Sequence, residues 1–201
     1  LMNGIVMKST GSWYLVKLEN GDLLECRLTG KFRTKGIKST NPIVVGDNVK
    51  VDKSDNSFMI TELFGRKNFI VRKAVNLSKQ THIIAANIEQ AILMITMESP
   101  VTTTTFIDRF LISANAYDVE VILLFNKMDL YNEHLKSTHK NLQSLYNKIG
   151  YKTISISTLN DDLSMVKELM KGKVNMISGH SGVGKSTLIN KLQPNLNIET
   201  K

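Results

Sequence analysis

Apolar and polar residues alternate over the first third of the chain, in short runs that turn residues separate. The segment 5–28 alternates in this way and is interrupted at Thr10-Gly11 and at Asn20-Gly21. The pair Asn-Gly predicts a two-residue hairpin, because both residues tolerate the positive φ angles that such a turn needs. The runs 44–52 and 57–63 repeat the alternation. About five short strands in this length predict a small closed all-β barrel of the OB-fold kind.

A different pattern begins near residue 81, where apolar runs alternate with segments of helical spacing. We predict strands at 90–97, 119–126, 152–157 and 173–178, and helices at 105–117, 133–150, 163–172 and from about residue 185. This alternation predicts an α/β domain, in which a mostly parallel sheet carries helices on both faces. Ligands of such sheets bind beyond the carboxyl ends of the strands.

The two patterns divide the chain into a barrel (1–68), a basic connection without clear periodicity (69–80) and an α/β domain (81–201). The net charge of +8 is unevenly divided between them. Residues 1–79 hold 14 Lys and Arg against 7 Asp and Glu, whereas residues 80–201 hold 12 against 11. A basic module beside a near-neutral one indicates contact with a polyanion such as RNA, the alternative being a solvated basic surface.

Several features narrow the class of protein. The longest apolar runs, 91–97 and 121–125, are far shorter than the roughly 18 residues that a membrane-spanning helix needs, so we expect a cytoplasmic protein without a membrane partner. Cys26 is the one cysteine, which excludes an internal disulfide and a zinc site made of several thiolates. We expect both Cys26 and Trp13 in the barrel core, with base stacking as the alternative for Trp13.

The segment GHSGVGKST at 179–187 fits the phosphate-loop pattern G-x-x-x-x-G-K-[ST] and lies between a predicted strand and a predicted helix. Glycines let successive backbone N–H groups point at phosphate oxygens, and the helix N-terminus adds a favourable partial charge. We expect Lys185 on the β- and γ-phosphates, Ser186 on Mg²⁺ and Thr187 near the α-phosphate. The predicted nucleotide-binding residues of this loop are Gly179, His180, Ser181, Gly182, Val183, Gly184, Lys185, Ser186 and Thr187; we predict no catalytic role for His180.

Four residues, Asn126, Lys127, Met128 and Asp129, form an N-K-x-D segment at the end of a predicted strand. The Asp129 carboxylate can accept hydrogen bonds from both N1–H and the 2-amino group of guanine. Adenine offers neither donor there, and a buried Asp129 without partners would cost about 1–3 kcal/mol. We expect Asn126 to bridge the base to the phosphate loop and the Lys127 stem to cover the ring. The alternative is a surface turn in an ATP-using enzyme.

A third loop, after the strand at 152–157, is expected to supply a backbone N–H to guanine O6. Both Ser155-Ile156-Ser157 and Ser157-Thr158-Leu159 fit this role, so Ser155 and Ser157 are candidate site residues.

Only 14 residues follow Thr187, too few for two strands and a second N-K-x-D segment. If both motifs serve one nucleotide, the base-reading motif precedes the phosphate loop, which is a circular permutation.

Two further groups of residues have structural explanations. The threonines at 102–105 precede a predicted helix and are expected to form a loop and a helix cap, not a GTPase switch. The four histidines, at 82, 134, 139 and 180, lack the helical spacing of metal ligands.

The motif order resembles that of the ribosome-small-subunit-dependent, circularly permuted GTPases known as the YjeQ/RsgA family. A basic five-stranded barrel, LLFNKMDL, a serine-rich loop and GHSGVGKSTLIN follow one another as in that family, over essentially the whole chain. The resemblance implies an OB-fold, a permuted GTPase domain that binds GTP or GDP with Mg²⁺, and hydrolysis stimulated by the small ribosomal subunit. It further implies a role in late maturation of that subunit and contact with its rRNA. We expect a monomer.

Members of this family continue beyond the phosphate loop with a switch threonine, a D-x-x-G segment and a zinc-binding domain, none of which occurs in this sequence. We therefore expect a fragment that does not itself ligate zinc, binds guanine nucleotides weakly and hydrolyses GTP very slowly. The catalytic residues stay unassigned. The competing interpretation is an RNA-binding module with a passive nucleotide-binding domain.

Overall fold

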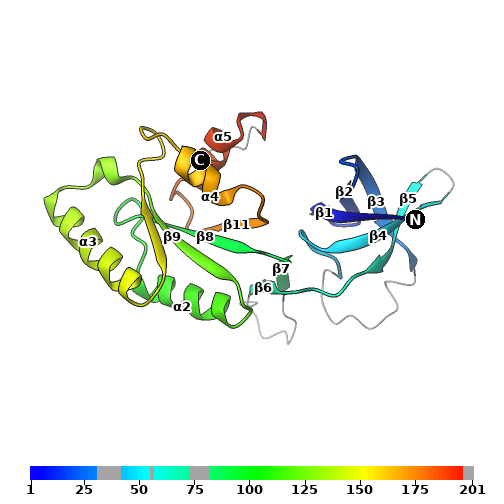
Figure 1. Ribbon diagram of the computed structural model, residues 1–201, viewed down its shortest axis with the longest axis horizontal. Helices are drawn as coiled ribbons and strands as arrows, with labels where there is room; N and C mark the ends of the chain where they lie inside the picture. Colours follow the sequence, from blue (N-terminus) through cyan, green and yellow to red (C-terminus); the bar gives the residue numbers. More distant parts are fainter. Residues whose placement is uncertain (31–41, 55–56, 73–81, 197–201) are drawn as a thin grey trace. The chain divides into compact units, whose positions relative to one another are not determined.

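The computed structural model describes residues 1–30, 42–54, 57–72 and 82–196 (Figure 1). The chain divides into two units, Leu1–Ile88 and Glu89–Lys201. The stretch 69–80, which we expected as a connection, begins with strand β6 (Phe69–Arg72), which pairs antiparallel with β7 (His82–Ala86) inside the first unit. Residues 73–80 of the expected connection lie outside the described residues.

Five strands of the first unit close into the predicted barrel. They are β1 (Met2–Thr10), β2 (Trp13–Leu18), β3 (Leu23–Leu28), β4 (Asn48–Ser54) and β5 (Ser57–Leu63), in the order β1-β2-β3-β5-β4. Alternate side chains of these strands fill the interior, where Val6, Val16 and Ile60 are fully buried. Cys26 is buried there as predicted, and burial raises the pKa of its thiol to about 11. This cysteine is therefore a packing residue with little thiolate character.

Trp13 corrects a prediction, because its side chain is 40% exposed and is not part of the core. Successive residues of a strand face opposite sides, so only one of the neighbours Trp13 and Tyr14 can point inward. Tyr14 takes the inner position, at 2% exposure. On the outer surface the Arg27 guanidinium of β3 lies 3.9 Å from the centre of the Trp13 ring. Trp13 and Arg27 therefore form a cation–π pair on the surface of β2 and β3.

A buried ion pair holds the end of the barrel unit together. Asp47 is fully buried, and both of its carboxylate oxygens accept hydrogen bonds of 2.7 Å from Arg66. One of those oxygens also accepts from the Val44 backbone N–H at 2.8 Å. Bidentate, charge-assisted hydrogen bonds of this kind are about twice as strong as neutral ones.

We expect Asp47→Asn to lower the free energy of unfolding of the barrel unit by about 2 kcal/mol, because the Arg66 charge then lacks a buried carboxylate. Urea unfolding followed by fluorescence of Trp13, the one tryptophan, reports on this unit. Glu62→Gln is the control, because Glu62 pairs with Lys50 on the exposed surface of the same barrel, and it should change the unfolding free energy of the barrel unit by less than about 0.5 kcal/mol. Equal urea midpoints for Asp47→Asn and the parent chain would contradict the prediction.

The second unit contains the predicted parallel sheet, with four strands in the order β10-β9-β8-β11. These are β8 (Gln90–Ile95), β9 (Glu120–Phe125), β10 (Lys152–Ser155) and β11 (Asn175–Ser178). Figure 1 shows α2 (Thr104–Asn115) and α3 (Glu133–Lys148) on one face, and α4 (Ser164–Met170) and α5 (Lys185–Leu192) on the other. Short 3₁₀ turns lie at Met128–Leu130 (η1) and Pro194–Leu196 (η2). Within the described ranges, no helix combines the length and the apolar character needed to span a membrane.

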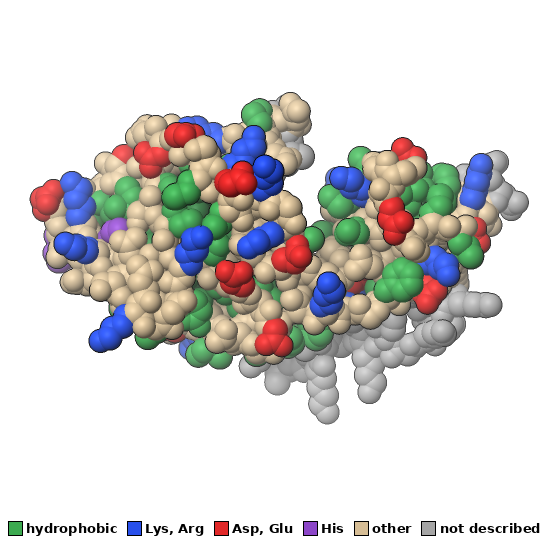
Figure 2. Space-filling model, viewed as in Figure 1, with side chains coloured by type: hydrophobic (Ala, Val, Ile, Leu, Met, Phe, Trp, Pro, Cys, Tyr) green, Lys and Arg blue, Asp and Glu red, His purple; other side chains and the backbone are tan. Residues whose placement is uncertain are grey.

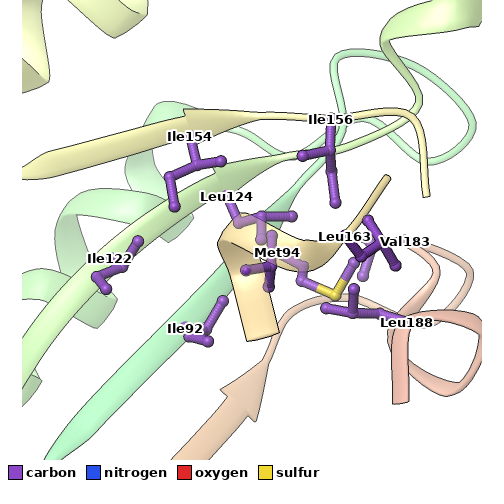
Figure 3. Packing of buried hydrophobic residues seen from close by; sticks show 10 residues of the cluster. Ile92, Met94, Ile122, Leu124, Ile154, Ile156, Leu163, Val183 and Leu188 are labelled. Atoms are coloured by element: carbon purple, nitrogen blue, oxygen red, sulfur yellow. The ribbon is translucent and has the colours of Figure 1, made fainter. Parts of the chain in front are cut away.

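Buried side chains from alternate positions of the strands form the core beneath α4 and α5. Figure 3 shows Ile92, Met94, Ile122, Leu124, Ile154 and Ile156 meeting Leu163, Val183 and Leu188 there. Val183 belongs to the glycine-rich segment before α5, so the core anchors this loop to the sheet. On the opposite face, the threonine run forms the predicted cap: the Thr103 hydroxyl accepts from the Phe106 N–H at the start of α2.

Candidate nucleotide-binding site

A cavity of about 560 Å³ lies at the carboxyl edge of the parallel sheet. Three loops supply its walls: the segment after β9, the segment after β10, and the glycine-rich loop that leads into α5. The two motifs that are well separated along the chain, 126–129 and 179–187, thus face one space. Its lining residues are Asn126, Lys127, Asp129, Leu130, Thr158, Leu159, Ser181, Gly182, Gly184, Lys185, Ser186 and Thr187.

The glycine-rich loop adopts a conformation that specifically requires glycine at Gly184. This residue has φ +102°, and a Cβ there would lie 2.6 Å from the Asn126 Nδ2. Lys185 begins α5, and its ammonium donates to the carbonyl oxygens of Gly179 at 2.8 Å and His180 at 2.6 Å. Burial lowers the pKa of Lys185 from its ordinary value. The loop is therefore shaped around an inward-pointing cation that an anionic ligand can attract.

Other residues of the same loop attach it to the rest of the α/β unit. The Val183 side chain is fully buried in the core, so its backbone and not its side chain faces the N-K-x-D segment. Gly179 has φ +144°, and a Cβ there would lie 2.6 Å from the Met94 carbonyl oxygen. The His180 ring lies 4.0 Å from the Phe106 ring, centre to centre. None of these three is among the described residues that line the cavity.

Asn126 joins all three loops through its side chain, which is 2% exposed. Its Nδ2 donates to the Val183 carbonyl at 2.9 Å, and its Oδ1 accepts from the Thr158 N–H at 3.0 Å and the Thr158 hydroxyl at 2.8 Å. The N-K-x-D segment and the glycine-rich loop therefore hold each other in position through the Asn126 side chain. The bridge to the phosphate loop that we expected of Asn126 is made to the loop's backbone.

The rest of the N-K-x-D segment turns sharply at the cavity. Lys127 has φ +63°, the left-handed region, and its ammonium donates to the Ser99 carbonyl. Met128 starts η1 and does not line the cavity, so only three residues of this segment do so among those described. Asp129 is exposed at the cavity, and its backbone N–H donates to the Ser157 hydroxyl at 2.9 Å.

The two alternatives for the third loop are placed differently. The Ser155 hydroxyl lies 2.9 Å from the His139 Nε2 and accepts from Gln143, beside α3 and not at the cavity. Ser157 is buried and supports the Asp129 backbone, whereas Thr158 and Leu159 line the cavity. Of the two candidate segments, 157–159 is therefore the one at the cavity.

Sequence reasoning missed Leu130 as a cavity residue, and treated Thr158 and Leu159 only as members of an alternative. A hydroxyl directly after Ser157 was the available signal for Thr158. The signal for Leu130 was absent, since an exposed leucine next to a motif has no distinctive pattern.

No group of three His, Cys, Asp or Glu side chains capable of holding a metal occurs in the described part of the chain, and the hydroxyl of Ser186 is the predicted metal ligand at the cavity.

Comparison with known proteins places both parts of the chain in one family. Residues 3–58 match the RsgA N-terminal domain, and residues 63–201 match the RsgA GTPase domain. A relative from Flavobacterium johnsoniae, named small ribosomal subunit biogenesis GTPase RsgA, is 56% identical over 204 residues, which cover 99% of this chain and 63% of the relative. A relative of the same name from Bacteroides fragilis is 51% identical over 99% of this chain and 65% of its own length. The chain thus spans less than two thirds of these relatives.

Solved structures show the same architecture. The crystal structure of YjeQ from Thermotoga maritima matches with a TM-score of 0.79 and 33% identity, over 100% of this chain and 68% of that one. YloQ, described as a circularly permuted GTPase, matches with a TM-score of 0.72 and 28% identity, over 98% of this chain and 66% of that one. The predicted fold, an OB-like barrel before a permuted P-loop domain, is confirmed. With both domain types in their expected order, the chain belongs to the RsgA GTPase family.

Proposed function

We propose that this chain is part of a GTP-binding and GTP-hydrolysing factor that acts in late maturation of the small ribosomal subunit. The observation that carries the proposal is that Asp129 and Lys185, from segments far apart in the sequence, line one cavity. Relatives named small ribosomal subunit biogenesis GTPase support the assignment to the ribosome. A cytoplasmic, monomeric protein fits this role.

Several residues of the cavity have a role in this proposal. Asp129 accepts from N1–H and the 2-amino group of guanine. The N–H groups of Ser157 and Thr158 already donate to Asp161 and Asn126, so we assign the Leu159 N–H to O6. Lys185 leaves the carbonyls of Gly179 and His180 to contact the β- and γ-phosphates. Burial lowers the pKa of Lys185 by disfavouring its charged form, and an anionic phosphate beside it offsets that effect. The hydroxyl of Ser186 fits Mg²⁺, which uses few protein ligands and completes its shell with phosphates and water.

Calorimetric titration of the chain with GDP and with ADP tests the proposal. We expect GDP to bind at least about 100-fold more tightly, because a site built to hydrogen-bond a base rejects one that lacks the donors. Equal affinity for the two nucleotides would overturn the assignment of Asp129 as the base reader and favour an ATP-using enzyme.

An RNA-binding role of the barrel is the second candidate function, and the exposed pair of Trp13 and Arg27 favours it. In OB-folds the outer surface of the second and third strands and the adjoining loops bind oligonucleotides, which is where this pair lies. Figure 2 shows Lys and Arg mixed with Asp and Glu on the face that it presents. Six basic residues of the first unit lie outside the described residues: Lys31, Arg33, Lys35, Lys38, Lys73 and Lys79.

We expect Trp13→Ala to weaken binding of a labelled single-stranded RNA of about 12 nucleotides roughly tenfold, because one stacked base contributes about 1–3 kcal/mol. Fluorescence anisotropy of the RNA measures this affinity. Met7→Ala, at an exposed position of β1 and therefore outside β2 and β3, is the control and should change it less than about twofold. Unchanged RNA binding in Trp13→Ala would remove the stacking role.

The two candidate functions differ in how nucleotide affects binding to small ribosomal subunits. A GTPase switch predicts different affinities with a GTP analogue, with GDP and without nucleotide. A passive nucleotide domain predicts the same affinity in all three states, so sedimentation with purified subunits separates the two interpretations.

A further inference from the structure

The hydroxyl of Tyr131 connects the segments that follow strands β8 and β9. The second of these segments is the N-K-x-D segment. The β8–β9 ladder ends at Ile95 and Phe125, and the Asn126 N–H still donates to the Ile95 carbonyl at 2.8 Å. Beyond that point the chains diverge. Tyr131 bridges them: its hydroxyl donates to the Asn126 carbonyl at 2.8 Å and accepts from the Met97 N–H at 2.9 Å.

The side chain that makes this bridge is shielded from water. Tyr131 is 4% exposed and, among the described residues, is not part of the cavity lining. Its ring centre lies 6.1 Å from that of His139, whose ring packs edge-on against Phe125. Burial raises the pKa of the Tyr131 hydroxyl, so it keeps the proton that it donates. A buried carbonyl and a part-buried N–H thus share one side-chain partner.

The Asn126 carbonyl belongs to the peptide group that enters Lys127. A peptide group is planar, so fixing its oxygen fixes the direction of the Lys127 N–H as well. Lys127 has φ +63°, a conformation that costs a non-glycine residue about 1–2 kcal/mol and persists only when neighbouring contacts impose it. The Tyr131 hydrogen bond is such a contact, and Asp129 follows two residues later.

We infer that Tyr131 is a positioning residue for the base-reading segment: through the Asn126 carbonyl it holds the turn that aims Asp129 at guanine. The inference rests on the proposed function, because it assigns Tyr131 an effect on base recognition. It predicts that losing one hydroxyl outside the cavity changes the preference between bases. A purely structural role would change stability alone.

Tyr131→Phe tests the inference, with Tyr146→Phe as a matched control. Tyr146 is 2% exposed, lies in the same unit, and its hydroxyl donates to the Asp108 carboxylate at 2.9 Å. Both variants therefore lose the hydroxyl of a buried tyrosine, which makes two hydrogen bonds at Tyr131 and one at Tyr146. We expect Tyr131→Phe to bind GDP about tenfold more weakly with ADP affinity changed less than about twofold, and Tyr146→Phe to keep the GDP affinity of the parent chain.

A calorimetric comparison of GDP and ADP distinguishes failure of the positioning role from failure of the proposed function. GDP affinity within twofold of the parent chain, or equal losses for both nucleotides, would overturn the positioning role while leaving the proposed function intact. A parent chain without preference for GDP would overturn the proposed function and this inference together.

Amide hydrogen exchange in the unaltered chain gives a second measurement that needs no substitution. If Tyr131 holds the arrangement that binds the base, saturating GDP should slow exchange at the Met97 N–H severalfold, because opening the bridge then competes with binding. Exchange at Met97 that is the same with and without GDP would count against the role of Tyr131.

Discussion

Asp129→Asn is expected to lower the affinity for GDP by at least about 100-fold and to make xanthosine diphosphate the preferred ligand. Two charge-assisted hydrogen bonds contribute about 1.5–3 kcal/mol each, so losing both accounts for a change of this size. Xanthine carries a carbonyl where guanine carries its 2-amino group, and an asparagine amide can donate to that oxygen. Competition between GDP and xanthosine diphosphate for the chain measures the switch.

Asp118→Asn is the appropriate control for this switch. Asp118 is exposed and lies just before β9, at the opposite edge of the sheet from the cavity. Its substitution makes the same chemical change without touching the site, so the preference for GDP should persist. If Asp129→Asn also kept the preference of the parent chain, the N-K-x-D segment would be an accidental match.

Gly184→Ala is expected to abolish binding of GDP and ADP alike, with a loss of at least about 100-fold. The added Cβ meets two obstacles: φ is +102°, which strains an alanine by about 1–2 kcal/mol, and the Asn126 Nδ2 would be 2.6 Å away. To relieve the contact, Asn126 must give up its bond to Val183 or the loop must move. Either response separates the base-reading and phosphate-binding segments, and direct titration with both nucleotides detects it.

Gly150→Ala separates backbone strain from this steric conflict. Gly150 has φ +99°, nearly the angle of Gly184, but a Cβ there meets no atom within 4 Å. Both variants therefore carry similar backbone strain and a similar loss of stability, measured by thermal unfolding. Nucleotide affinity should fall only in Gly184→Ala. A similar fall in Gly150→Ala would show that general destabilisation, and not the contact with Asn126, explains the result.

Much of the fold was predictable because its elements follow from local patterns. The period-two alternation of 5–28 predicts strands whose inner residues include Val6, Val16 and Cys26, and these residues are buried in the barrel. A hairpin turn forms at Asn20-Gly21, but it is not the two-residue turn that we predicted: Gly21 has φ +92° whereas Asn20 is not at positive φ, and the Leu18 N–H donates to the Asp22 carbonyl across three residues. The phosphate loop was recognisable because its glycines meet a backbone requirement that few other residues satisfy.

Other features escaped prediction because they depend on partners distant in sequence. Alternation predicts that one of Trp13 and Tyr14 faces inward, but the register against neighbouring strands decides which one. Two serines, at 155 and 157, were equivalent as candidates until the end of β10 placed the first beside His139 and the second beneath Asp129. A tyrosine such as Tyr131 carries no motif, and its role is visible only where its hydroxyl meets both Asn126 and Met97.

The sequence by itself determined the chemical groups and their order: a carboxylate that suits guanine, a phosphate loop, and the arrangement in which the first precedes the second. Only the tertiary structure decided that these groups share one cavity, and which neighbours hold them there. The physical reason is that short-range patterns set strands, turns and loop conformations, whereas the meeting of Asn126 with Val183 and Thr158 arises only when parallel strands bring their carboxyl ends to one edge.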